Sequence, residues 1–174
     1  MADYQSIPSI GQAHENSCWA ACLAWFLKQD TDGRPSWTQK EIMDIYWRSL
    51  DSNGAMIPEY MVQAWKTDKR LRMSTRVHPT PDYELKSLPL GSKPVCIAFK
   101  HLTGFAHMNV IWKATETAVW CMEPYWPFPG KNGKRTGRFV KREIDDHFNY
   151  GDNVVLAWAN APGAGGTATP AEAG

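Results

Sequence analysis

The order of the sequence patterns predicts a single α+β domain, because helical segments come first and short strands follow. A chain of 174 residues is long enough for one domain with its own hydrophobic core. The segment CWAACLAWFLK at 18–28 is apolar on every side, which predicts a helix that is buried all round. Short segments rich in Val, Ile and Trp predict the strands of an antiparallel sheet at 95–99, 106–114, 118–122 and 154–158.

Capping signals place the other helices. Thr38 and Glu41 have the spacing of a capping box and predict a helix that runs to about residue 49. Pro58 suits the first turn of a helix that ends near residue 69. The segment 70–81 has no clear pattern. The remaining expectations are a short helix at 83–88, a basic Gly-rich loop at 128–141 and a short helix at 142–148.

Composition and charge exclude several classes of protein. The net charge of +1 gives no positive field for nucleic acid. The longest apolar run is about half the roughly 20 residues of a membrane span, and the first residues lack the pattern of a signal peptide. We therefore expect a cytoplasmic fold at 1–158 without nucleic-acid or membrane partners, and a flexible Ala/Gly/Pro tail at 159–174. The basic run at 131–142 fits a solvated loop, with docking to an acidic surface as the alternative.

Four cysteines raise the question of a metal, a disulfide or a reactive thiol. Cys18 and Cys22 lie in the apolar helix, and Cys96 and Cys121 lie in predicted strands. Their spacing lacks the paired short motifs of a zinc site, and a reducing compartment disfavours disulfides. We expect no metal, no cofactor, and core packing for the last three cysteines. Cys18 differs, because the unpaired amides and the dipole of a first helical turn favour a thiolate.

A glutamine stands six residues before this cysteine. The side-chain amide of Gln12 and the backbone amide of Cys18 could together stabilise an oxyanion. The simpler interpretation is a small buried residue at a helix start, next to an ordinary surface glutamine.

A nucleophilic cysteine needs a base, and His107 is the best placed histidine. It begins the strand HMNVIWKA, whose alternation places it on one face with Asn109, Ile111 and Lys113. His101, in an expected turn, is the second choice, and a polar residue at a strand edge is the simpler interpretation of His107. The weaker candidates are His14, His78 and His147.

The base in turn needs an orienting partner. Glu123 follows the strand at 118–122, so its carboxylate could accept a hydrogen bond from His107 one strand away. Asn109 is a second possible orienting residue. Trp19 and Trp126, which follow the cysteine and the acid along the chain, are candidates to line a substrate groove.

The motif Gln12-x5-Cys18-Trp19-Ala-Ala resembles the nucleophile motif of papain-like cysteine proteases. The nearest groups are the double-glycine leader peptidase domains of bacteriocin-exporting ABC transporters and the bacterial effector proteases of type III and type VI secretion. The segments YELKSLPLGSKPVCIAFK, HMNVI and MEPYWP are similar to the regions around the histidine and the acid there. The resemblance covers roughly 7–158 and departs at Ala106, where the family usually has Gly, and at Glu123, where Asp or Asn is usual.

This resemblance implies a papain-like fold, with a central nucleophile helix packed on a C-terminal antiparallel sheet. It implies a cysteine endopeptidase in which Cys18 is the nucleophile, His107 the general base and acid, Glu123 the orienting acid and Gln12 the oxyanion-hole donor. Cleavage would follow small residues such as Gly-Gly in a protein or peptide substrate. A stand-alone protease of this kind suggests an effector or toxin delivered by a dedicated secretion system, with an immunity or inhibitor protein as a partner.

Two other functions use the same residues differently. An amidase, deamidase or acyltransferase would use the same Cys-His-acid site without cutting a chain. A catalytically inactive peptidase-like binding module is the third hypothesis, although such modules typically lose the nucleophile that Cys18 would be.

Overall fold

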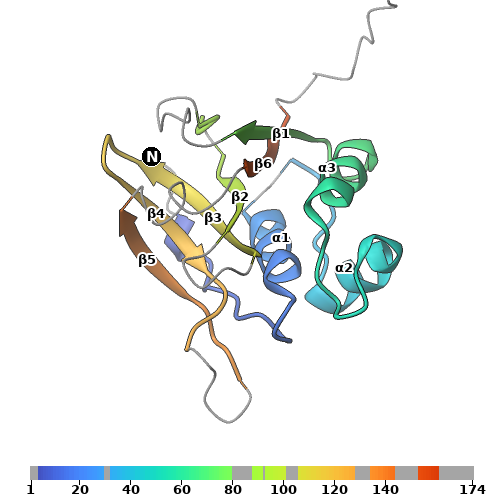
Figure 1. Ribbon diagram of the computed structural model, residues 1–174. Helices are drawn as coiled ribbons and strands as arrows, with labels where there is room; N and C mark the ends of the chain where they lie inside the picture. The colour runs from blue at the N-terminus through green and yellow to red at the C-terminus, as the bar shows by residue number, and fades with distance from the viewer. Residues whose placement is uncertain are drawn as a thin grey trace, which may run out of the picture.

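The computed structural model describes residues 4–29, 32–79, 88–91, 93–100, 106–127, 134–143 and 153–160. These residues form an α+β fold of three α-helices and a six-stranded antiparallel sheet (Figure 1). The helices are α1 (Cys18–Lys28), α2 (Gln39–Tyr46) and α3 (Pro58–Thr67), with short 3₁₀ turns at Tyr4–Ser6 and Trp47–Ser49. The strands are β1 (Met73–Pro79), β2 (Val95–Lys100), β3 (Ala106–Ala114), β4 (Ala118–Glu123), β5 (Arg138–Glu143) and β6 (Asn153–Ala159). The sheet order is β1-β6-β2-β3-β4-β5.

The sequence signals for three of the helices are confirmed. Helix α1 spans the predicted apolar segment and is buried from Trp19 to Leu27, with its sides against β2, β3 and α2. Thr38 and Glu41 form the capping box at the start of α2. Pro58 occupies the first turn of α3, which packs on β1 and β6 and ends two residues before the predicted limit. The predicted helix at 83–88 lies outside the described residues except at its last position.

Two strands were not predicted, and both lie at the edges of the sheet. Strand β1 occupies most of the segment without a pattern, and β5 lies where a basic loop and the start of a helix at 142–148 were expected. The helix prediction is wrong at Arg142 and Glu143, which are the last residues of β5; the rest of that segment lies outside the described residues. An edge strand is often charged and owes its conformation to its single partner strand, so local sequence indicates it poorly.

Apolar side chains form a separate cluster on each face of the sheet. Alternation in β3 sends Met108 and Val110 toward the helices and Ile111 to the opposite face, as predicted. The prediction for Lys113 is wrong, because a register shift after Ile111 pairs it with Trp120, on the side of the sheet opposite Ile111. The Lys113 ammonium lies 4.4 Å from the centroid of the Trp120 ring.

The N-terminal arm passes so close to the segment before β5 that Gly11 has no room for a side chain. A Cβ at Gly11 would lie 1.8 Å from the carbonyl oxygen of Arg135. The arm also donates the amide of Gln12 to the carbonyl of Pro124, at 3.0 Å, directly beyond β4. The segment that leads into α1 is therefore held against the residues that follow β4 and precede β5.

We expect Gly11→Ala to reduce the free energy of unfolding by about 1–3 kcal/mol, the usual cost of forcing atoms into a packed region. Gly91→Ala is the matched control, because a Cβ at Gly91 meets no atom within 4 Å. Urea unfolding of both variants measures the difference. Equal stabilities would contradict the close approach of the arm.

Candidate active site

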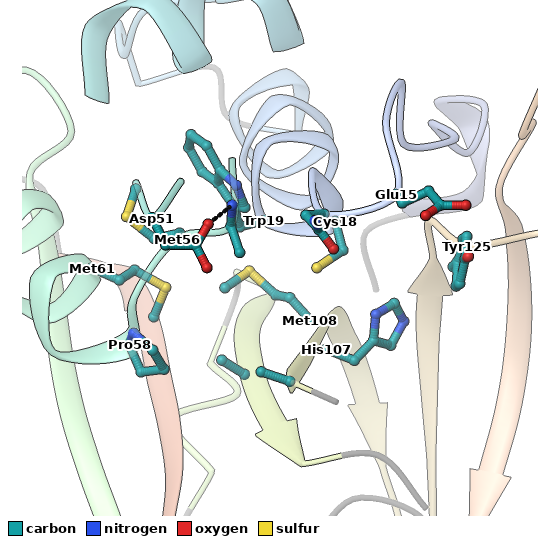
Figure 2. A pocket seen from close by; sticks show the side chains of 14 residues that line it. Glu15, Cys18, Trp19, Asp51, Met56, Pro58, Met61, His107, Met108 and Tyr125 are labelled. Carbon is teal, nitrogen blue, oxygen red and sulfur yellow. Dashed lines mark hydrogen bonds between the residues drawn. The ribbon is translucent and has the colours of Figure 1, made fainter. Parts of the chain in front are cut away.

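Cys18 is the first residue of α1, at the end of the helix that points into a pocket of about 530 Å³ (Figure 2). Its side chain is partly exposed, whereas the helix is buried from Trp19 to Leu27. No side chain caps this helix end, since the Ser17 hydroxyl bonds only to the backbone of His14. The N-terminal dipole of α1 therefore acts on Cys18 without a competing side-chain acceptor at the cap.

The pocket has two unlike sides, with Cys18 and His107 between them (Figure 2). Tyr125 and Glu15 lie on one side in this view. The other side is mostly apolar: it is formed by Trp19, Met56, Pro58, Met61 and Met108, with the carboxylate of Asp51 beside Met56. A substrate lying over Cys18 would therefore meet a polar wall on one side and thioethers on the other.

His107 is buried at the start of β3, and its side chain is hydrogen-bonded to Cys18. Its Nε2 lies 2.7 Å from Oε1 of Glu123, which leaves Nδ1 as the ring nitrogen for the thiol. Burial lowers the pKa of His107, but hydrogen bonds to Cys18 and Glu123, together with their charges, outweigh burial and raise that pKa to about 9. The imidazole is thus held in a form that can carry a proton at neutral pH.

Glu123 ends β4 and is as deeply buried as the histidine. Its Oε1 accepts from His107 and from the Tyr125 amide, both at 2.7 Å. Its Oε2 accepts from Asn109 Nδ2 at 3.0 Å and from Arg142 Nη2 at 2.5 Å. Burial raises the pKa of Glu123, but the hydrogen bond and charge of His107 and the charge of Arg142 dominate and hold that pKa well below its usual range. The carboxylate is therefore ionised and has two donors on each oxygen.

The choice between Glu123 and Asn109 as partner of His107 follows from these distances. Asn109 Nδ2 lies 3.4 Å from His107 Nε2, but donates at 3.0 Å to both Glu123 Oε2 and the Met108 carbonyl. A side-chain NH₂ cannot accept from a ring N–H. The carboxylate is thus the hydrogen-bond partner of the imidazole, and Asn109 supports the carboxylate.

Gln12 is buried close to Cys18 in sequence but does not line the pocket. Its Nε2 donates to the carbonyls of His14 and Glu15, at 2.8 and 2.6 Å. In this arrangement its amide organises the loop that leads into α1. Donation to an oxyanion would require one of these two bonds to be exchanged, so that role stays a prediction.

The two tryptophans predicted for a substrate groove differ in position. Trp19 is a wall of the pocket, and its indole N–H donates to the Gly54 carbonyl at 3.3 Å. Trp126 does not line the pocket, and the guanidinium of Arg138 lies 3.6 Å from its ring centroid. The structure brings only Trp19 to the site.

None of the other described cysteines and histidines lines the pocket. Burial raises the pKa of the thiols of Cys22 and Cys96, and Cys121 is fully buried. His14 is exposed and does not line the pocket, and His78 lies on β1. The second-choice base, His101, and also His147 lie outside the described residues. Cys18 is therefore the accessible thiol among the four.

Two sets of site residues were missed from sequence. Arg142 reaches Glu123 from β5, a strand that the sequence did not reveal. The segment RFVKRE lacks a strict alternation of apolar and polar residues, so it carries no clear local signal for a strand. The methionines of the pocket come from separate elements, and no local pattern joins them.

No family model matches the chain, and no curated protein matches it significantly. None of the described helices combines the length and the hydropathy that a membrane crossing requires. Within the described ranges, His, Cys, Asp and Glu side chains form no group of three or more that could hold a metal ion.

Proposed function

We propose that this protein is a papain-like cysteine endopeptidase. The observation that carries the proposal is the chain of side chains Cys18, His107 and Glu123, which runs from the open pocket into the buried sheet. A thiol at a helix start, a base in contact with it and a carboxylate that fixes the base form the arrangement that nucleophilic catalysis requires.

The chemistry follows from the proton positions. The Cys18 thiolate attacks the carbonyl carbon of a peptide bond, and the carbonyl oxygen takes up negative charge near the start of α1. The His107 imidazolium gives its proton to the leaving amine as the C–N bond breaks, which leaves a thioester on Cys18. Neutral His107 then takes a proton from water as the water oxygen attacks the thioester. Cys18 leaves as thiolate, and the imidazolium is restored.

The pocket supports an apolar residue beside the cut. Met56, Met61 and Met108 line one side, and methionine adapts its shape to different apolar groups. The resemblance instead favours small residues such as Gly-Gly, so the residue before the cut decides between the two specificities. We retain the role of a secreted bacterial effector or toxin, with an immunity or inhibitor protein as partner, as part of the proposal.

A search for new protein N-termini tests the activity. A denatured proteome extract is incubated with the wild type and, separately, with Cys18→Ala, and the new termini are identified by mass spectrometry. We expect cuts that depend on Cys18, with one class of residue, apolar or small, enriched before them. A mass change of side chains without chain cleavage would favour the deamidase or acyltransferase hypothesis. No Cys18-dependent change of either kind would contradict catalysis.

A further inference from the structure

We infer that Arg142 is a positioning residue of the site, which fixes the Glu123 carboxylate so that one oxygen faces His107. This inference rests on the proposed function only in so far as Cys18 and His107 are the reacting groups. The sequence pattern favoured a solvated loop for the basic run that contains Arg142. In the structure its guanidinium instead donates to a buried carboxylate at 2.5 Å.

The sheet explains how a residue so far along β5 reaches the site. Arg142 pairs with Val119, and Glu123 pairs with Arg138, so all four side chains share one face of the β4–β5 ladder. The Arg142 side chain therefore extends diagonally along β4 to Glu123. Arg138, which is directly opposite Glu123, points its guanidinium at the Trp126 ring, 3.6 Å from the centroid. Arg138, although nearer along the strand, thus contacts Trp126, and Arg142 is the arginine that binds Glu123.

A glutamate needs such a restraint more than the shorter acid usual in the family. Its additional methylene adds a rotatable bond, so the carboxylate can turn away from the imidazole. Arg142 and Asn109 together occupy Oε2, and only Oε1 remains for His107. The arginine also supplies a positive charge to a carboxylate whose side chain is 5% exposed, where an unpaired charge is costly.

If Arg142 acted only through its charge, its removal would shift the pKa of His107 in one direction. If Arg142 positions Glu123, its removal would shift that pKa in the opposite direction. Removing a positive charge near Glu123 makes the local potential more negative, which by itself would raise the pKa of His107. Releasing Glu123 weakens its hydrogen bond to Nε2, which lowers that pKa from about 9 toward the ordinary value near 6.5. The direction in which the His107 pKa shifts therefore shows whether Arg142 acts as a charge or as a positioning residue.

The test compares Arg142→Met, which keeps the length without the charge, with Arg142→Lys, which keeps a charged donor. Arg138→Met is the matched control from the same strand. The first readout is the rate at which iodoacetamide alkylates Cys18 at pH 6, and the second is the NMR titration of the His107 ring. We expect alkylation to slow roughly tenfold in Arg142→Met, as outer partners of site residues typically contribute. We expect Arg142→Lys to lie nearer the wild type, and the His107 midpoint to fall in Arg142→Met alone.

Three outcomes would overturn the inference: an unchanged or raised His107 midpoint in Arg142→Met, equal alkylation rates in the Met and Lys variants, or a loss as large in Arg138→Met. A second comparison adds Arg142→Met to Glu123→Gln, where no buried carboxylate needs a counter-charge. If Arg142 acts through Glu123, alkylation does not slow further there, whereas an equal loss in both backgrounds overturns the inference.

The alkylation readout requires no substrate. A wild-type protein that cuts no protein, yet couples Arg142 to Cys18 in this way, would refute the proposed function and leave the positioning role intact. Cys18-dependent cleavage with no effect of Arg142 on alkylation of Cys18 would support the proposed function and refute the positioning role.

Discussion

Replacing His107 with alanine is expected to slow alkylation of Cys18 by iodoacetamide at pH 6 on the order of 10²-fold. An ordinary cysteine thiol, with a pKa of about 8.5, is only about 0.3% ionised at that pH. In the wild type, His107 is hydrogen-bonded to Cys18 and can hold a proton beside its sulfur up to about pH 9. Removing the imidazole removes the proton acceptor and does not bury the thiol more deeply, so the slowing would not come from reduced access. Proteolysis should be lost in the same variant.

His14→Ala is the matched control for this measurement. His14 is only four residues from Cys18 along the chain, but its side chain is exposed and does not line the pocket. We expect its alkylation rate to stay within about twofold of wild type, as for a surface change away from the site. A comparable loss in both variants would show that His107 is not the specific partner of the thiol.

The second large effect is expected for Glu123→Gln, which keeps the shape of the side chain and removes its charge. Four donors converge on this carboxylate, and a neutral amide presents an NH₂ group to two of them. We expect a loss of about 2–4 kcal/mol in unfolding free energy, since buried partners are left unsatisfied. We also expect proteolysis to fall roughly 10²–10⁴-fold, because the imidazole loses its orienting group.

The pH dependence of stability separates this effect from simple loss of packing. The pKa of His107 is raised from about 6.5 to about 9 by folding, so its contribution to stability is fully present below pH 6.5 and is lost as pH rises through 9. Glu123→Gln should remove the part of that dependence that comes from the hydrogen bond and charge of Glu123, while the part that comes from Cys18 remains. The gap between wild type and variant in urea unfolding should therefore be wider at pH 6 than at pH 10. An equal difference in unfolding free energy at pH 6 and pH 10 would indicate that the variant loses only packing.

Local patterns predicted α1, α2, α3 and the inner strands because each of those segments carries its own signal. The apolar segment at 18–28 can only be satisfied by burial, and the alternation of β3 fixes which residues share the face of His107 as far as Ile111. The identity of Cys18, His107 and Glu123 as a group also came from sequence, and the structure brings these three together.

What sequence did not predict depends on pairing between distant segments. Arg142 reaches Glu123 only because β5 pairs with β4 in one particular register. A slip of one residue would send Arg142 to the other face. The hydrogen bonds of Gln12 depend in the same way on the conformation of the loop before α1, which no motif specifies.

The most direct test of the central claim is to trap the intermediate on Cys18. Wild-type protein is mixed with a peptide library made by digesting a proteome, quenched with acid within the first turnovers, and fragmented for mass spectrometry. We predict that the peptide containing Cys18 carries, through a thioester, the N-terminal fragment of a cleaved library peptide, and that His107→Ala carries none. Cleavage of the library without an acyl group on Cys18, an acyl group on another residue, or no cleavage and no acyl group at all would contradict the account.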